Sequence, residues 1–157
     1  MTDYTLLCAQ LTSMNEGCSL PLPVLSNAAA LLWLSLPRIN WAGFYLLRGN
    51  TLILGPFQGK PACTVIALDR GVCGAAARAR RTQWVDDVRR FPGHIACDSA
   101  SASEIVIPLI LPDGRLLGVL DIDSPETGRF SEADQAGLES FARALCETVS
   151  WESGLLG

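Results

Sequence analysis

Two segments in the N-terminal part of the chain carry apolar residues at helical spacing. In the first, residues 3–16, Leu7, Leu11 and Met14 recur at i, i+4 and i+7, and Leu6 lies beside them. This spacing predicts an amphipathic helix with one face in the core.

The second segment, 24–36, follows Pro21 and Pro23 and is apolar around most of its circumference. A helix of this kind is expected to be buried on two sides, against its own sheet and against another subunit. Because both N-terminal helices are too apolar for a fully solvated face, the sequence predicts a homodimer.

A first hairpin is predicted by two apolar runs, 40–47 and 51–57, on either side of a Gly-Asn turn. Strand alternation places Trp41 and Tyr45 on one face. They are either core residues or the wall of a pocket.

A second hairpin is predicted by the runs 104–111 and 115–123 around a Pro-Asp-Gly turn. Its last strand ends in two aspartates, Asp121 and Asp123, separated by Ile122. Alternation directs both aspartates to the same face of the sheet.

The remaining elements complete an α+β pattern. Further strands are expected at 63–68 and 83–85, and helices at 72–80 and 131–151. Hairpins rather than βαβ crossovers favour an antiparallel sheet of about six strands with helices packed on its faces. Residues 1–157 are expected to form one domain.

The composition of the chain limits the classes of function that it can have. The chain is 49% hydrophobic and 18% charged, as in a compact soluble protein, and its net charge of −4 gives no case for nucleic-acid binding. No apolar run is long enough for a membrane, and no leader pattern opens the chain, so a cytoplasmic location is expected. Six cysteines in that compartment favour catalytic or metal-binding thiols over structural disulfides.

Three of these cysteines, Cys63, Cys73 and Cys97, lie in a region rich in Gly, Ser and Asp. None forms a Cys-x2-Cys pair, so a structural zinc site is not expected. Redox chemistry needs a nucleophilic thiolate and a second thiol that can reach it, and this spacing permits such a pair.

Two of the three are candidate nucleophiles. Cys97 lies in a polar loop between His94 and Asp98; an imidazolium would lower its pKa and an aspartate would oppose that effect. Cys73 lies near a predicted helix N-terminus, where the macrodipole favours a thiolate.

Glu104, Asp121 and Asp123 stand on strand ends beside this region. They could be solvated surface groups, but Asp is disfavoured in an otherwise apolar strand. The functional interpretation is that they bind a cationic group, donate a proton, or both.

Six short segments, taken together, closely resemble the free methionine-(R)-sulfoxide reductase family, whose members are single GAF domains. The segments are Asn40–Leu46, Leu54–Gly59, Gly71–Gly74, Gly93–Asp98, Ser103–Val106 and Gly118–Ser124. Cys8, Cys18 and Cys146 belong to none of these segments, so the resemblance assigns no function to them.

The resemblance implies that Cys97 attacks the sulfoxide sulfur of free methionine-(R)-sulfoxide and becomes a sulfenic acid. Cys63 then condenses with it to a disulfide, which thioredoxin reduces, and no cofactor is bound. Cys73 is a second resolving thiol or itself the nucleophile.

The resemblance also assigns Glu104, Asp121 and Asp123 to substrate binding and catalysis. The residues themselves fit this assignment, because carboxylates can bind the α-ammonium group and Trp41 and Tyr45 can hold the S-methyl group. The alternatives are a GAF small-molecule sensor and a thiol redox switch without turnover.

Overall fold

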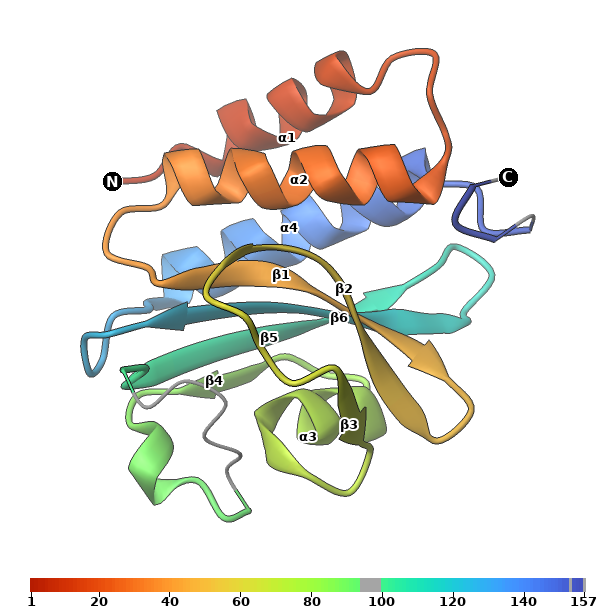
Figure 1. The fold of residues 1–157 in the computed structure, drawn as a ribbon. Helices are drawn as coiled ribbons and strands as arrows, with labels where there is room; N and C mark the ends of the chain where they lie inside the picture. Colours follow the sequence, from red (N-terminus) through yellow and green to blue (C-terminus); the bar gives the residue numbers. More distant parts are fainter. Residues whose placement is uncertain (94–99, 153, 157) are drawn as a thin grey trace.

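The computed structural model describes residues 1–93, 100–152 and 154–156. Its described elements form a six-stranded sheet with helices on both faces (Figure 1). In chain order they are α1 (Tyr4–Met14), α2 (Pro21–Ser35), β1 (Trp41–Arg48), β2 (Thr51–Gly59), β3 (Val65–Ala67), α3 (Gly71–Ala79), β4 (Gln83–Val85), the 3₁₀ helix η1 (Val88–Arg90), β5 (Ser103–Ile110), β6 (Leu116–Ser124) and α4 (Glu132–Thr148).

The sheet has the strand order β3-β2-β1-β6-β5-β4, and each neighbouring pair is antiparallel. The two predicted hairpins are present as β1–β2 and β5–β6. They meet through β1 and β6, so the segment with the two aspartates lies at the centre of the sheet. The predicted α+β class and antiparallel sheet are confirmed.

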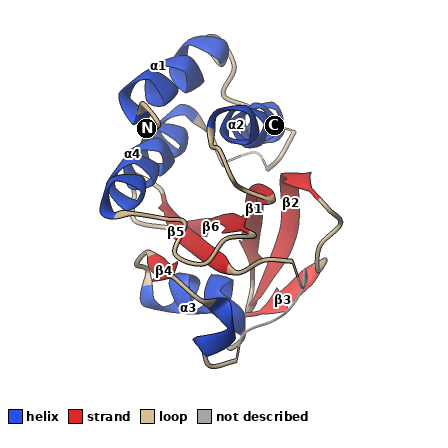
Figure 2. Ribbon diagram, turned by 90° about the vertical axis from the view of Figure 1, so that its left-hand side faces the viewer, coloured by secondary structure: helices blue, strands red, loops and turns tan. Residues whose placement is uncertain are grey.

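Helices α2 and α4 cover one face of the sheet, α1 packs on these two helices, and α3 covers part of the other face (Figure 2). The first face carries the main core, in which Phe44 and Ile122 from the sheet are fully buried with Leu25 and Phe141 from the helices. Strand alternation sends the intervening residues of β1 and β6 to the opposite face, beneath α3. That face carries the polar groups described below.

Several predicted boundaries were wrong by a few residues. Helix α2 begins at Pro21 rather than at 24, because proline is tolerated in the first helical turn, where its missing N–H has no intrahelical partner. Strand β3 covers only Val65–Ala67, so Cys63 precedes it. Helix α4 ends at Thr148, and η1 was not predicted.

The predicted apolar face of α1 is only partly correct. Leu7 and Leu11 are buried, but Met14 and Leu6 are exposed. The polar Asn15 is buried next to Met14, and its side-chain amide donates to the carbonyl oxygen of Leu11 at 2.8 Å. At the C-terminal end of the helix, a polar side chain bonded to the backbone is therefore buried in place of the predicted Met14.

Helix α2 is buried on the sheet side and exposes Trp33 and Leu34 on the other. The homodimer stays a prediction. Within the described residues, no helix has the length and apolar character needed to cross a membrane.

Candidate active site

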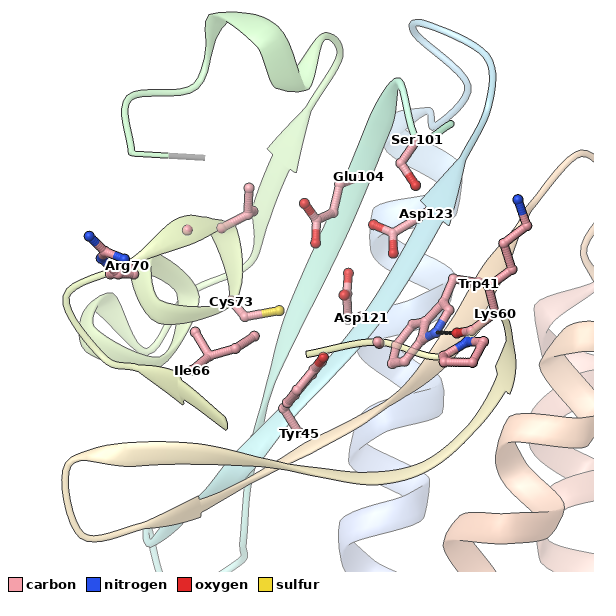
Figure 3. Close-up of a pocket in the computed structure, with 14 residues that line it drawn as sticks. Trp41, Tyr45, Lys60, Ile66, Arg70, Cys73, Ser101, Glu104, Asp121 and Asp123 are labelled. Atoms are coloured by element: carbon pink, nitrogen blue, oxygen red, sulfur yellow. Dashed lines mark hydrogen bonds between the residues drawn. The ribbon is translucent and has the colours of Figure 1, made fainter. Parts of the chain in front are cut away.

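A cavity of about 580 Å³, partly open to solvent, lies between the sheet face beneath α3, the start of α3 and the loop at 60–62 (Figure 3). Six residues predicted from the sequence line it: Trp41, Tyr45, Cys73, Glu104, Asp121 and Asp123. The other lining residues are Lys60, Pro61, Ala62, Ile66, Arg70, Gly71, Val72 and Ser101. Of these, Gly71 and Val72 lie in one of the six segments that carry the family resemblance, and the other six were not predicted from the sequence.

The carboxylates meet through the register of the central strands. Asp123 on β6 is paired with Trp41 on one side and with Glu104 on the other. Asp121 lies two residues earlier on the same face, opposite Gly43 of β1. Three acidic side chains from two strands therefore converge on one cavity, as alternation predicted for the two aspartates.

Burial differs among the three carboxylates. Asp121 is 5% exposed and Glu104 is 7% exposed, whereas Asp123 is half-buried. Burial raises the pKa of Glu104 well above its usual value, and the neighbouring Asp121 raises it further. The pKa of Asp121 is also raised, first by burial and then by the charge of Asp123. The pair is therefore suited to hold a proton that ordinary carboxyl groups have lost at neutral pH.

Cys73 is placed in the cavity by the first turn of α3. Gly74 allows this turn to lie against the chain, because a Cβ there would be 2.6 Å from the carbonyl oxygen of Leu68. Burial raises the pKa of Cys73 well above its usual value, and Asp121, Glu104 and Asp123 add to the effect. The expectation that the helix N-terminus favours a thiolate here was wrong, because desolvation and three carboxylates outweigh the dipole.

An aromatic stack forms the opposite wall. The Trp41 ring lies 5.8 Å from the Tyr45 ring and 5.2 Å from the Phe57 ring, and both pairs are stacked. Gly43 makes room for it, since a Cβ at that position would lie 2.3 Å from Cβ of Phe57. The prediction that Trp41 and Tyr45 wall a pocket is confirmed.

The same two aromatic residues hold the loop that precedes β3. The indole Nε1 of Trp41 donates to the carbonyl oxygen of Lys60 at 3.1 Å. The hydroxyl of Tyr45 donates to the carbonyl oxygen of Cys63 at 2.8 Å. These backbone acceptors have no signature in the sequence, so the link between the pocket wall and Cys63 could not have been predicted.

The cysteines differ in their bonding state and in their distance from the cavity. Cys63 takes part in a disulfide, whereas Cys8, Cys18, Cys73 and Cys146 carry free thiols. The predicted nucleophile Cys97 and its neighbour His94 lie outside the described residues. Cys8, Cys18 and Cys146 pack with the helices on the other face of the sheet, away from the cavity.

The GAF domain family model matches residues 24–146, which include the whole sheet and α3. The chain belongs to the GAF domain family. The sheet residues that line the cavity lie on the face that α3 covers. In Figure 2 this face lies opposite the main helical layer.

Similarity to known proteins extends over most of this GAF domain. It is 50% identical to "Free methionine-R-sulfoxide reductase" of Escherichia coli (strain K12), over 91% of this chain and 82% of that protein. It is 50% identical to "Free methionine-R-sulfoxide reductase" of Saccharomyces cerevisiae, over 77% and 71%. The reduced form of fRMsr of Staphylococcus aureus superposes with a TM-score of 0.91 at 50% identity, covering 96% of this chain and 97% of that one.

Proposed function

We propose that this GAF domain reduces free methionine-(R)-sulfoxide to methionine. The observation that carries the proposal is the cavity that combines Glu104, Asp121 and Asp123 with an aromatic wall. Two relatives at 50% identity are named for this reaction, and fRMsr of Staphylococcus aureus is known in complex with substrate. A free amino acid fits such a cavity, because it offers both an ammonium group and an apolar S-methyl group.

The chemistry proceeds in three balanced steps. The Cys97 thiolate attacks the sulfoxide sulfur while a carboxyl group protonates the sulfoxide oxygen. The sulfur–oxygen bond of the substrate breaks, the hydroxyl group passes to the Cys97 sulfur, and methionine leaves, so the sulfoxide is reduced and Cys97 is oxidised to a sulfenic acid. The Cys63 thiol then condenses with this sulfenic acid, which forms a disulfide and releases water. A dithiol protein of the thioredoxin class reduces the disulfide and is itself oxidised.

The environments of the carboxylates suggest a division of labour. Glu104 and Asp121 are buried together, and their raised pKa values favour a shared proton, so we assign the proton donor to this pair. Asp123 is half-buried at the other end of the acidic row, and we assign it to the α-ammonium group. Trp41 and Tyr45 provide the apolar contact for the S-methyl group.

The disulfide at Cys63 supports its role as the resolving cysteine. Our proposal pairs Cys63 with Cys97. Cys73 is a poor nucleophile in its present surroundings, because its raised pKa leaves little thiolate at neutral pH.

The test is a coupled assay in which NADPH consumption by thioredoxin reductase and thioredoxin follows turnover. Separate R and S epimers of free methionine sulfoxide and a peptide-bound form are the substrates. We expect turnover of the free R epimer alone. Disulfide formation with peroxide but no turnover of any sulfoxide would instead favour a redox switch, and binding without thiol chemistry would favour a sensor.

Tyr45→Phe should separate the first chemical step from the second. The phenyl ring keeps the apolar wall, but the hydrogen bond to the carbonyl oxygen of Cys63 is lost. A bond of this kind contributes about 1 kcal/mol, so we expect disulfide formation to slow up to about tenfold while methionine release in a single turnover stays within about twofold. Rapid quenching with thiol alkylation measures both rates.

The matched control is Tyr4→Phe, since the Tyr4 hydroxyl donates to Asp134 within the α1–α4 layer and does not line the cavity. Neither rate should change in that variant. Equal slowing of both steps in Tyr45→Phe would mean that the hydroxyl acts on the substrate rather than on Cys63.

A further inference from the structure

Three side chains from separate parts of the chain form a tight cluster in the cavity. The Sγ of Cys73 and one carboxylate oxygen each of Glu104 and Asp121 lie within 4.8 Å of one another, and all three residues are buried. Figure 3 shows the three groups pointing toward one another from α3, β5 and β6.

A second observation indicates that this cluster is an incomplete site. The Oδ1 atom of Asp121 is fully buried and accepts no hydrogen bond within the described residues. A buried carboxylate oxygen without a donor is costly, and native structures usually satisfy it with a donor, a water or a cation.

Among the described residues, no side-chain cation neutralises this oxygen. Lys60 and Arg70 are the basic residues that line the cavity, and both are exposed. In Figure 3 their charged ends point away from the three clustered groups. The cluster therefore offers a thiol and two carboxyl groups to whatever positive charge enters.

We propose that Cys73, Glu104 and Asp121 bind a divalent transition metal of the zinc type. One sulfur and two oxygen ligands suit a borderline-soft ion, whereas calcium and magnesium prefer oxygen alone. Binding replaces the thiol proton by the metal, so a proton is released. The fourth position of a tetrahedral ion is left to water or to Asp123, which lines the same cavity.

The ion is a competitor rather than a resident cofactor. It occupies the acidic cluster that, in the proposed reaction, serves the substrate, and the metal-free pocket is the working form. Zinc is therefore expected to inhibit the reductase. This inhibition rests on the proposed function, whereas the binding of the metal ion does not depend on it. The short-range patterns typical of zinc sites could not reveal these ligands, because the three residues come from separate elements.

The experiment uses Co²⁺ as a spectroscopic probe, with Zn²⁺ as its competitor, on the full chain in its disulfide form. In that form Cys63 is already bonded, so a thiolate-to-cobalt charge-transfer band must come from another cysteine. We expect the band in the wild type, its loss on adding Zn²⁺, and its absence in Cys73→Ser. Cys18→Ser is the control and should keep the band.

A second variant, Asp121→Asn, tests the metal site even if Cys73→Ser fails to fold. Asp121→Asn keeps the shape of the side chain and every cysteine but removes one charged ligand, so the Co²⁺ affinity should fall by about tenfold or more. Circular dichroism of each variant reports folding independently of the metal.

The outcomes separate the two proposals. No band in the wild type, or an unchanged band in Cys73→Ser, would overturn the metal site and leave the reductase assay unaffected. A Cys73-dependent band in a protein that turns over no sulfoxide would support the metal site and refute the reductase function. Zinc-buffered assays should further show that added substrate relieves inhibition of the wild type; inhibition that substrate does not relieve would contradict competition.

Discussion

Replacing Cys97 by serine should abolish multiple turnover of free methionine-(R)-sulfoxide, with a loss on the order of 10³-fold or more. A serine hydroxyl at neutral pH is a far weaker nucleophile than a thiolate and cannot form a sulfenic acid or a disulfide. The coupled NADPH assay measures the loss. Methionine release in a single turnover tests the attack itself and should also disappear.

Matched cysteine variants make this result specific. Cys18→Ser should keep full activity, because Cys18 packs with the helical layer on the opposite face of the sheet. Cys63→Ser should release about one equivalent of methionine and then stop, because the sulfenic acid on Cys97 can no longer form a disulfide with residue 63. If Cys97→Ser still released one equivalent and Cys73→Ser did not, Cys73 would be the nucleophile despite its raised pKa.

The second large effect is expected for Asp121→Asn. Asparagine is nearly isosteric but has no acidic proton, and proton donation in a transition state typically contributes 10²- to 10⁴-fold. We therefore expect kcat to fall by about 10²-fold or more. Because the donor must be protonated, wild-type activity should be lost as pH rises through the pKa of the Glu104–Asp121 pair, which burial places above the usual carboxyl range.

Two further variants test whether the loss of kcat is specific to the proton donor. Asp123→Asn should mainly raise KM, because it removes a contact to the ammonium group that substrate and transition state share. Asp113→Asn is the control, since Asp113 lies on the exposed β5–β6 turn, where it pairs with Arg115. A similar fall in kcat for Asp123→Asn and Asp121→Asn would contradict the proposed division of labour.

Local patterns determined much of the fold. Two turn signals and period-two alternation were enough to predict both hairpins, and alternation fixed the shared face of Asp121 and Asp123. These inferences succeeded because a strand has only two faces, so the sequence alone decides which side chains are neighbours along it. Boundaries were less accurate where side-chain capping and proline chemistry, as at Asn15 and Pro21, override apolar periodicity.

Motifs likewise determined which residue types carry the chemistry. The cysteines, the acidic residues and the aromatic pair could all be selected from their segments, and the structure brings Cys73, the three carboxylates and both aromatic residues to one cavity. Cys97 was selected in the same way, and it lies outside the described residues.

Only the tertiary structure decided how these groups affect one another. The helix position of Cys73 alone suggested a thiolate, but its packing against Asp121 and Glu104 raises its pKa and creates the cluster with an unsatisfied oxygen. The contact between the Tyr45 hydroxyl and the Cys63 carbonyl likewise joins two segments through a backbone atom. Electrostatic and hydrogen-bonding effects depend on distance and burial, which are fixed when separate elements pack together and are not encoded in any single segment of the sequence.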